Sequence, residues 1–176
     1  MSHNKPVGVL DTRYSDNRKK NLPLIFRYKT RARIVALAIR EYLGSETGLD
    51  ILDFGSAEGL TLREFDHELP RKTIIGPEFS QEIINAEPDL PSNISLLHAD
   101  VLDLPEKIKQ NRYDVITALA LLEHVSKPGI CFSNAYKLLR PGGLFIASSP
   151  KPFWDNVSSK LGMLADDQHE IDITKN

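Results

Sequence analysis

The sequence has little cysteine, no long apolar run and almost no net charge. Its one cysteine, Cys131, cannot form a disulfide within the chain, so we expect a reducing, cytoplasmic compartment. No apolar run approaches the roughly 20 residues that a membrane-spanning helix needs, and the amino-terminal residues show no apolar signal region. The net charge of −2 creates no overall field directed at nucleic acid or membrane surfaces. We therefore expect neither a membrane span nor a nucleic-acid partner.

The 176 residues, of which 41% are hydrophobic and 26% charged, suit one α/β domain with a real core. Strand-like runs alternate with helical stretches along most of the chain. This alternation predicts a parallel sheet with helices on both faces and a ligand at the carboxyl ends of the strands. The expected strands are 50–54, 73–77, 94–98, 113–119 and 143–149, and the expected helices are 59–69, 80–86, 104–110 and 128–139.

The amino-terminal part of the chain is polar and basic. Residues 1–29 are expected to form a loose arm, in which a short helix could form. The arm could be a solvated tail, a lid over a site or a contact for an anionic partner. From Thr30 to Leu43 apolar residues recur with helical spacing, and Gly44 is a plausible end for that helix.

A turn of small residues follows the first expected strand. Gly55, Ala57 and Gly59 stand at i, i+2 and i+4, whereas the dinucleotide-binding fingerprint places its third glycine at i+5, here Leu60. Such a turn lets backbone amides approach a ligand and directs a helix N-terminus at it. Ala57 is expected to be tolerated in place of glycine with a negative φ.

An acidic residue stands at the carboxyl end of each of the first three strands. These residues are Asp53, Glu78 and Asp100. Each alone could be a helix cap or a loop residue, but together with the small-residue turn they indicate a nucleoside-containing cofactor. Glu78 could accept hydrogen bonds from both hydroxyls of a ribose, and Asp100 could accept one from an adenine amino group.

Five segments in this order resemble the class I S-adenosylmethionine-dependent methyltransferases. They read ILDFGSAEG, IIGPEF, LLHADVLDLP, YDVITALALLEHV and LLRPGGLFIASSP. The resemblance covers residues 30–152 and is strongest to the small-molecule group that includes quinone-biosynthesis enzymes. It implies a Rossmann-like, doubly wound and mostly parallel sheet of order 3-2-1-4-5, with S-adenosylmethionine as cofactor. It also implies methyl transfer to a small-molecule acceptor, which we expect at oxygen.

The resemblance also implies roles for individual residues. Asp53 would orient the amino group of the methionyl part, Phe79 would pack on the adenine, and Val101 would supply a nearby backbone amide. Leu119 and Ala120 would border the methionyl group. The residues expected to bind the cofactor are Asp53, Gly55, Ser56, Ala57, Gly59, Glu78, Phe79, Asp100, Val101 and Leu119.

A hydroxyl acceptor would benefit from a general base. His124, after the fourth strand, is the nearest candidate, although it could instead be a capping or packing histidine. His169 is the second candidate. It lies in an acid-rich tail with Asp166, Asp167 and Glu170 that is expected to be solvated, so no metal site is expected.

The chain departs from the family pattern at its carboxyl end. The family sheet continues past the fifth strand, whereas here residues 153–176 form an incomplete segment that could be mobile. The fifth strand would then be an exposed edge, through which two copies could pair as a homodimer. The alternative function is a non-catalytic subunit that keeps the fold and cofactor binding. A nicotinamide-dependent oxidoreductase is disfavoured by the i+4 glycine spacing.

Overall fold

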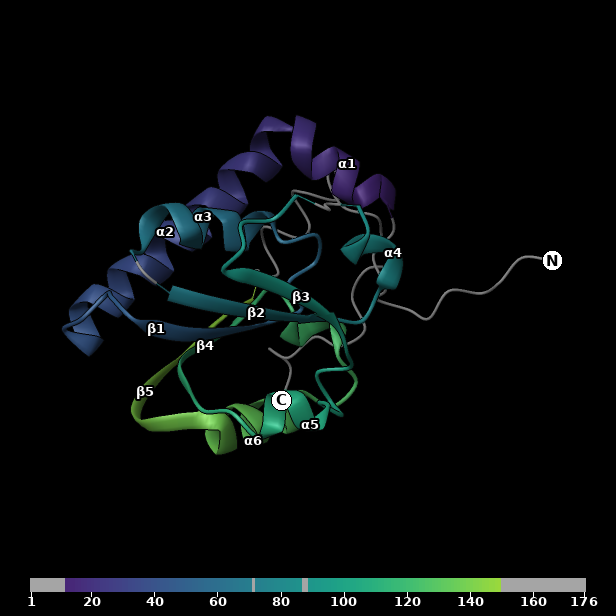
Figure 1. The fold of residues 1–176 in the computed structure, drawn as a ribbon. Helices are drawn as coiled ribbons and strands as arrows, with labels where there is room; N and C mark the ends of the chain where they lie inside the picture. Colours follow the sequence, from purple (N-terminus) through teal and green to yellow (C-terminus); the bar gives the residue numbers. More distant parts are fainter. Residues whose placement is uncertain (1–11, 71, 87–88, 150–176) are drawn as a thin grey trace.

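The computed structural model describes residues 12–70, 72–86 and 89–149, and Figure 1 shows their arrangement. All paired strands are parallel, and the sheet has the order β3-β2-β1-β4-β5. This order confirms the prediction for the Rossmann-like sheet. The strands are β1 (Leu49–Phe54), β2 (Lys72–Glu78), β3 (Ile94–His98), β4 (Tyr113–Leu119) and β5 (Leu139–Ser148).

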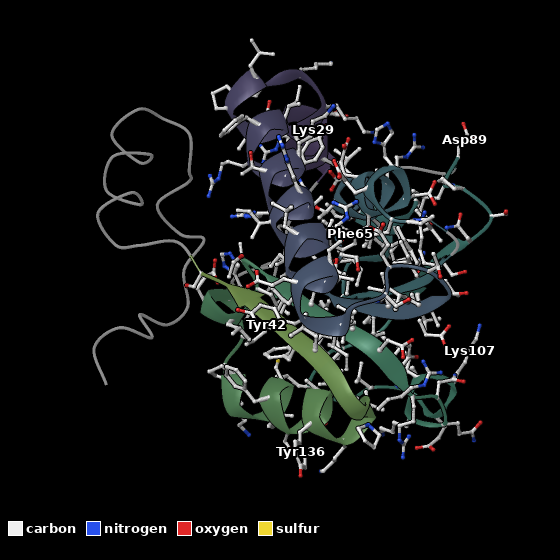
Figure 2. The ribbon with its side chains drawn as sticks, turned by 90° about the vertical axis from the view of Figure 1, so that its left-hand side faces the viewer. Lys29, Tyr42, Phe65, Asp89, Lys107 and Tyr136 are labelled. Carbon is white, nitrogen blue, oxygen red and sulfur yellow. The ribbon has the colours of Figure 1, made fainter. Side chains whose placement is uncertain are left out.

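Helices cover both faces of the sheet because successive strand residues point to opposite sides. Ile51 belongs to a core cluster beneath α2 (Leu22–Leu43) and α3 (Leu60–Glu68), and its neighbour Leu52 belongs to a cluster on the other face. That second cluster includes residues of α5 (Glu106–Lys109) and α6 (Pro128–Leu138). Figure 2 shows Phe65 inside the layer beneath α2, whereas Tyr136 points outward from α6. The central strands β1 and β4 are therefore buried from both sides, whereas no residue of the edge strand β5 is fully buried.

The remaining helices are short and lie near the carboxyl ends of the strands. They are α1 (Thr12–Lys20), α4 (Gln81–Ile84) and the 3-10 helix η1 (Leu122–His124). In Figure 1, α1 and α4 lie at the same end of the molecule. Within the described ranges, no helix is both long enough and apolar enough to cross a bilayer.

The expectation of a loose arm is wrong for residues 12–29, which are helical apart from Asn21. The helix predicted from Thr30 begins at Leu22, with Pro23 in its first turn, where a proline costs no backbone hydrogen bond. Leu24, Tyr28 and Ala32 are buried at intervals of four residues, so one continuous face packs on the core. Gly44 ends α2 with a φ of 63°, as predicted.

The fifth strand also begins earlier than predicted, at Leu139. Leu139 pairs with Tyr113, and the next pair is Leu144 with Val115, so an irregularity separates them. Arg140 lies within this irregular segment and donates hydrogen bonds to Asp114 (2.5 Å) and to Asp50 (2.7 Å). Residues 140–142, which precede the strand expected over 143–149, thus lie in an irregular part of β5.

Candidate functional site

The turn after β1 is a tight loop with positive φ at alternate residues. The φ angles are 69° for Gly55, 49° for Ala57 and 84° for Gly59. The expected negative φ of Ala57 is therefore wrong, and the alanine adopts a left-handed conformation that costs an L-residue about 1–2 kcal/mol. A Cβ added to Gly55 would lie 2.6 Å from Cδ1 of the Leu121 side chain, which can move, so glycine is favoured there chiefly by its φ. The turn therefore passes close to the segment that follows β4.

Glu78 joins the end of β2 to this turn. Its side chain is buried, with Oε2 accepting a hydrogen bond from the Ala57 N–H at 2.9 Å and Oε1 accepting one from the Ser80 N–H at 2.9 Å. A second link is the Gly55 N–H, which donates to the Pro77 carbonyl at 3.0 Å. An ionised carboxylate has about four acceptor positions. Glu78 can therefore accept further hydrogen bonds from a ligand while it holds the turn.

Asp53 lies beneath the turn and is almost completely buried. The Thr117 hydroxyl of the neighbouring strand donates to Asp53 Oδ1 at 2.5 Å, and the Ser56 hydroxyl donates to the Asp53 carbonyl at 2.6 Å. Burial raises the pKa of the Asp53 carboxyl to about 7, although the Thr117 hydrogen bond and the charge of Arg18 act in the opposite direction. A nearby positive charge would therefore lower the pKa of this carboxyl and favour its ionised form.

Asp100 comes two residues after the end of β3. Two contacts place Asp100 close to Glu78 along the sheet. Glu78 pairs with His98, and the Ala99 N–H donates to the Glu78 carbonyl at 2.9 Å. Asp100 Oδ1 accepts a hydrogen bond from the Leu102 N–H at 2.8 Å. Since β1, β2 and β3 are adjacent and parallel, the three predicted acids lie at or just after neighbouring carboxyl ends, on the same side of the sheet.

Phe79 and Val101 flank these acids differently. The Phe79 side chain is half exposed, and its ring centroid lies 6.4 Å from that of His98. An exposed aromatic ring at these strand ends offers a flat surface on which a nucleobase can stack. Val101 is buried, and its carbonyl accepts a hydrogen bond from Asn134 of α6.

The end of β4 forms the other side of the site. Leu119 is the last residue of the strand, and Ala120 follows with a φ of 54°. This second left-handed alanine could not be predicted from the residue type. His124 lies in η1, partly buried, with Nε2 4.0 Å from Oε1 of the buried Glu123.

Sequence reasoning also missed the contacts that Arg18 makes with Glu58 of the turn and Thr61 of α3. Arg18 of α1 donates hydrogen bonds to Glu58 Oε2 at 3.3 Å and to the Thr61 hydroxyl at 3.2 Å. The signal in the sequence is Glu58 itself, a charged residue between Ala57 and Gly59 in a turn of small residues. A buried carboxylate there requires a cation from elsewhere in the chain.

Among residues 12–70, 72–86 and 89–149, no group of three or more His, Cys, Asp or Glu side chains is arranged to hold a metal ion. The second candidate base, His169, and its acidic neighbours Asp166, Asp167 and Glu170 lie outside the described residues. Cys131 is buried in α6, and burial raises the pKa of its thiol to about 11.

Comparisons with known proteins identify the family and the fold. The methyltransferase domain family matches residues 26–170. The chain is 29% identical over 129 residues to a ubiquinone biosynthesis O-methyltransferase of Nitrobacter winogradskyi, which is 67% of this chain and 44% of that protein. It is 30% identical over 111 residues to a malonyl-(acyl-carrier protein) O-methyltransferase of Halalkalibacterium halodurans, which is 60% of this chain and 41% of that protein.

Solved structures share the fold. The plantazolicin methyltransferase BpumL in complex with SAH superposes with a TM-score of 0.70 at 19% identity, over 89% of this chain and 59% of that one. The chain spans less than half the length of the two curated relatives. The sheet order, the acids at its edge and the family match over most of the chain lead to one conclusion: the chain belongs to the class I S-adenosylmethionine-dependent methyltransferases.

Proposed function

We propose that this chain binds S-adenosylmethionine at the carboxyl edge of β1, β2 and β3 and transfers its methyl group to an oxygen of a small molecule. The observation that carries the proposal is the Glu78 carboxylate, which holds the Ala57 N–H of the turn and keeps acceptor positions for a ligand. A carboxylate in this place suits the two adjacent hydroxyls of a ribose, so the residues fit the cofactor of the family.

The neighbouring residues extend this binding site along the sheet edge. Phe79 provides a half-exposed ring for the adenine, and Asp100 an acceptor for its amino group, next to Val101. In the other direction, Asp53 faces the positively charged methionyl part, which Leu119 borders. Backbone atoms of the turn approach the cofactor at Gly55, Ser56, Ala57 and Gly59.

The protein's contribution to the reaction is mainly orientation and exclusion of water. When bound, S-adenosylmethionine supplies an electrophilic methyl carbon, whose bond to sulfur breaks as its bond to the acceptor oxygen forms. Holding two reactants in line can contribute about 7–11 kcal/mol to lowering a barrier. His124 is the proposed base that takes the proton from the acceptor hydroxyl, since it lies in η1 just after β4.

Oxygen as the acceptor atom is supported by the names of the two curated relatives, both O-methyltransferases. Pairing of two copies is also part of the proposal, because β5 ends the described part of the sheet. Light scattering on the purified chain would give a mass near twice 19.8 kDa if the copies pair. The mass of a single chain at all protein concentrations would contradict the proposed pairing.

Calorimetric titration with S-adenosylhomocysteine tests the cofactor site without an acceptor. We expect micromolar affinity for the wild type and a loss of at least tenfold for Glu78→Gln, since hydrogen bonds to a charged group contribute about 1.5–3 kcal/mol. Glu106→Gln, an exposed glutamate of α5, is the matched control and should bind like the wild type. Absence of binding to the folded wild type would overturn the proposal.

A test of turnover follows the cofactor product. The protein is incubated with S-adenosylmethionine and a panel of phenols, carboxylic acids and amines, and release of S-adenosylhomocysteine is measured. Acceptor-dependent release with a hydroxyl or carboxyl compound supports oxygen transfer. Release only with amines contradicts it, and binding without any release favours the non-catalytic alternative.

A further inference from the structure

Helix α1 lies across the end of the molecule at which the cofactor is proposed to bind. Its Arg18 reaches Glu58 in the turn and Thr61 in the first helical turn of α3, while the next residue, Lys19, donates to the Ala86 carbonyl after α4 at 3.1 Å. These contacts join α1 to segments that follow β1 and β2 (Figure 1). The helix is thus attached on two sides of the candidate site.

The contact between Arg18 and Glu58 is a buried ion pair. The Arg18 side chain is 10% exposed and that of Glu58 is fully buried, with 3.3 Å between Nη1 and Oε2. Burial raises the pKa of the Glu58 carboxyl, and the charge of Arg18 opposes this. The guanidinium also lies over the Tyr28 ring of α2, 5.5 Å from its centroid. Because a buried carboxylate without a cation is strongly unfavourable, Glu58 favours the docked position of α1.

Glu58 connects this ion pair to the backbone of the turn. It stands between Ala57, whose N–H is held by Glu78, and Gly59, and both neighbours have positive φ. An alanine in a left-handed conformation persists only where its surroundings impose it. Glu78 holds the turn from the sheet side, and Arg18 holds it from the α1 side.

We propose that Arg18 and Glu58 are positioning residues, whose ion pair docks α1 and holds the glycine turn in its cofactor-binding conformation. The inference rests on the proposed function, because it assumes that the turn binds the cofactor. Neither side chain has to touch the cofactor. Since coupling between two events is reciprocal, cofactor binding must in turn stabilise the docked α1.

The test compares charge-removing variants with matched controls in the full chain. Arg18→Met removes the cation, and Lys20→Met removes an exposed cation from the same helix. Ser15→Ala alters a buried α1 residue whose hydroxyl has no hydrogen-bond partner among the described residues. The measurements are the dissociation constant for S-adenosylhomocysteine and the hydrogen exchange of residues 12–20 with and without it.

For the wild type we expect that S-adenosylhomocysteine slows exchange in residues 12–20 at least fivefold. Arg18→Met should bind at least tenfold more weakly and lose this ligand-dependent slowing, whereas Lys20→Met and Ser15→Ala should behave like the wild type. A merely structural role for Arg18 would lower the melting temperature without removing the ligand-dependent slowing, and that result would overturn the inference.

A double variant keeps the test decisive if Arg18→Met does not fold. Arg18→Met with Glu58→Met leaves no unpaired carboxylate, and apolar replacement of a buried ion pair is often neutral for stability. We expect it to fold but to bind S-adenosylhomocysteine at least fivefold more weakly than the wild type. Wild-type affinity in this variant would overturn the inference about Arg18 and Glu58 but not the proposed function. Absence of binding to the wild type would overturn the proposed function.

Discussion

The stability that Asp53 contributes to the fold should decrease as the pH rises from 5 to 7, because the unfolded chain ionises this carboxyl while the folded protein keeps it protonated. Burial raises the pKa of its carboxyl from 3.8 to about 7. Above pH 3.8 the unfolded chain has lost this proton while the folded protein retains it, so folding takes up a proton. The stability that this group contributes is complete below the unfolded pKa and is lost as the pH rises through about 7. At 1.36 kcal/mol per pH unit, the total is about 4 kcal/mol.

The variant Asp53→Asn isolates this contribution. The amide has the same shape, and its oxygen can still accept the Thr117 hydroxyl, but it does not ionise. We expect the unfolding free energy of the wild type, relative to that of Asp53→Asn, to fall by about 1.4 kcal/mol per pH unit between pH 5 and 6.5. Urea titrations of both proteins at several pH values measure this difference.

An exposed aspartate provides the control for that experiment. The Asp103 side chain is 90% exposed, so Asp103→Asn should show a nearly constant difference from the wild type over the same pH range. If the difference in unfolding free energy between Asp53→Asn and the wild type stays constant between pH 5 and 7, the burial argument for Asp53 is wrong.

Three further changes test the turn and the core. Ala57→Gly should raise the unfolding free energy by about 0.5–1 kcal/mol, because relief of the left-handed strain exceeds the entropy that glycine adds to the unfolded chain; a less stable variant in urea titrations would contradict this. Gly76→Ala should lower the same quantity by about 1–3 kcal/mol, since its Cβ would lie 2.7 Å from Ser56 Cβ and 2.9 Å from Leu96 Cδ2; unchanged stability would refute the close packing. Cys131 should react with a disulfide reagent only as fast as the protein unfolds, because its thiol is buried with a pKa raised to about 11; rapid reaction of the native protein would show otherwise.

The sheet could be predicted because its strands are apolar runs separated by clear turn and helix signals. Ile51, Leu52 and Phe54 are fully buried in β1, and such a run is typical of a strand covered on both faces. The start of β5 was predicted too late, since Pro141 and two glycines indicate a turn. In the structure, Arg140 holds that segment against Asp50.

The long-range contacts of the site could not be predicted. Arg18 and Glu58 are 40 residues apart, and no periodicity connects them. The α2 start was missed because the basic residues around Leu24 and Tyr28 conceal the buried face. The φ of Ala57 depends on how the turn is held by Glu78, which the residue type does not reveal.

A crystal structure of the protein with S-adenosylhomocysteine tests the central claim most directly. We predict that both ribose hydroxyls lie within hydrogen-bond distance of the Glu78 carboxylate, with the adenine against Phe79 and its amino group facing Asp100. The methionyl part should run along the turn toward Leu119. A ligand bound elsewhere, or a ribose that makes no contact with Glu78, would contradict the account.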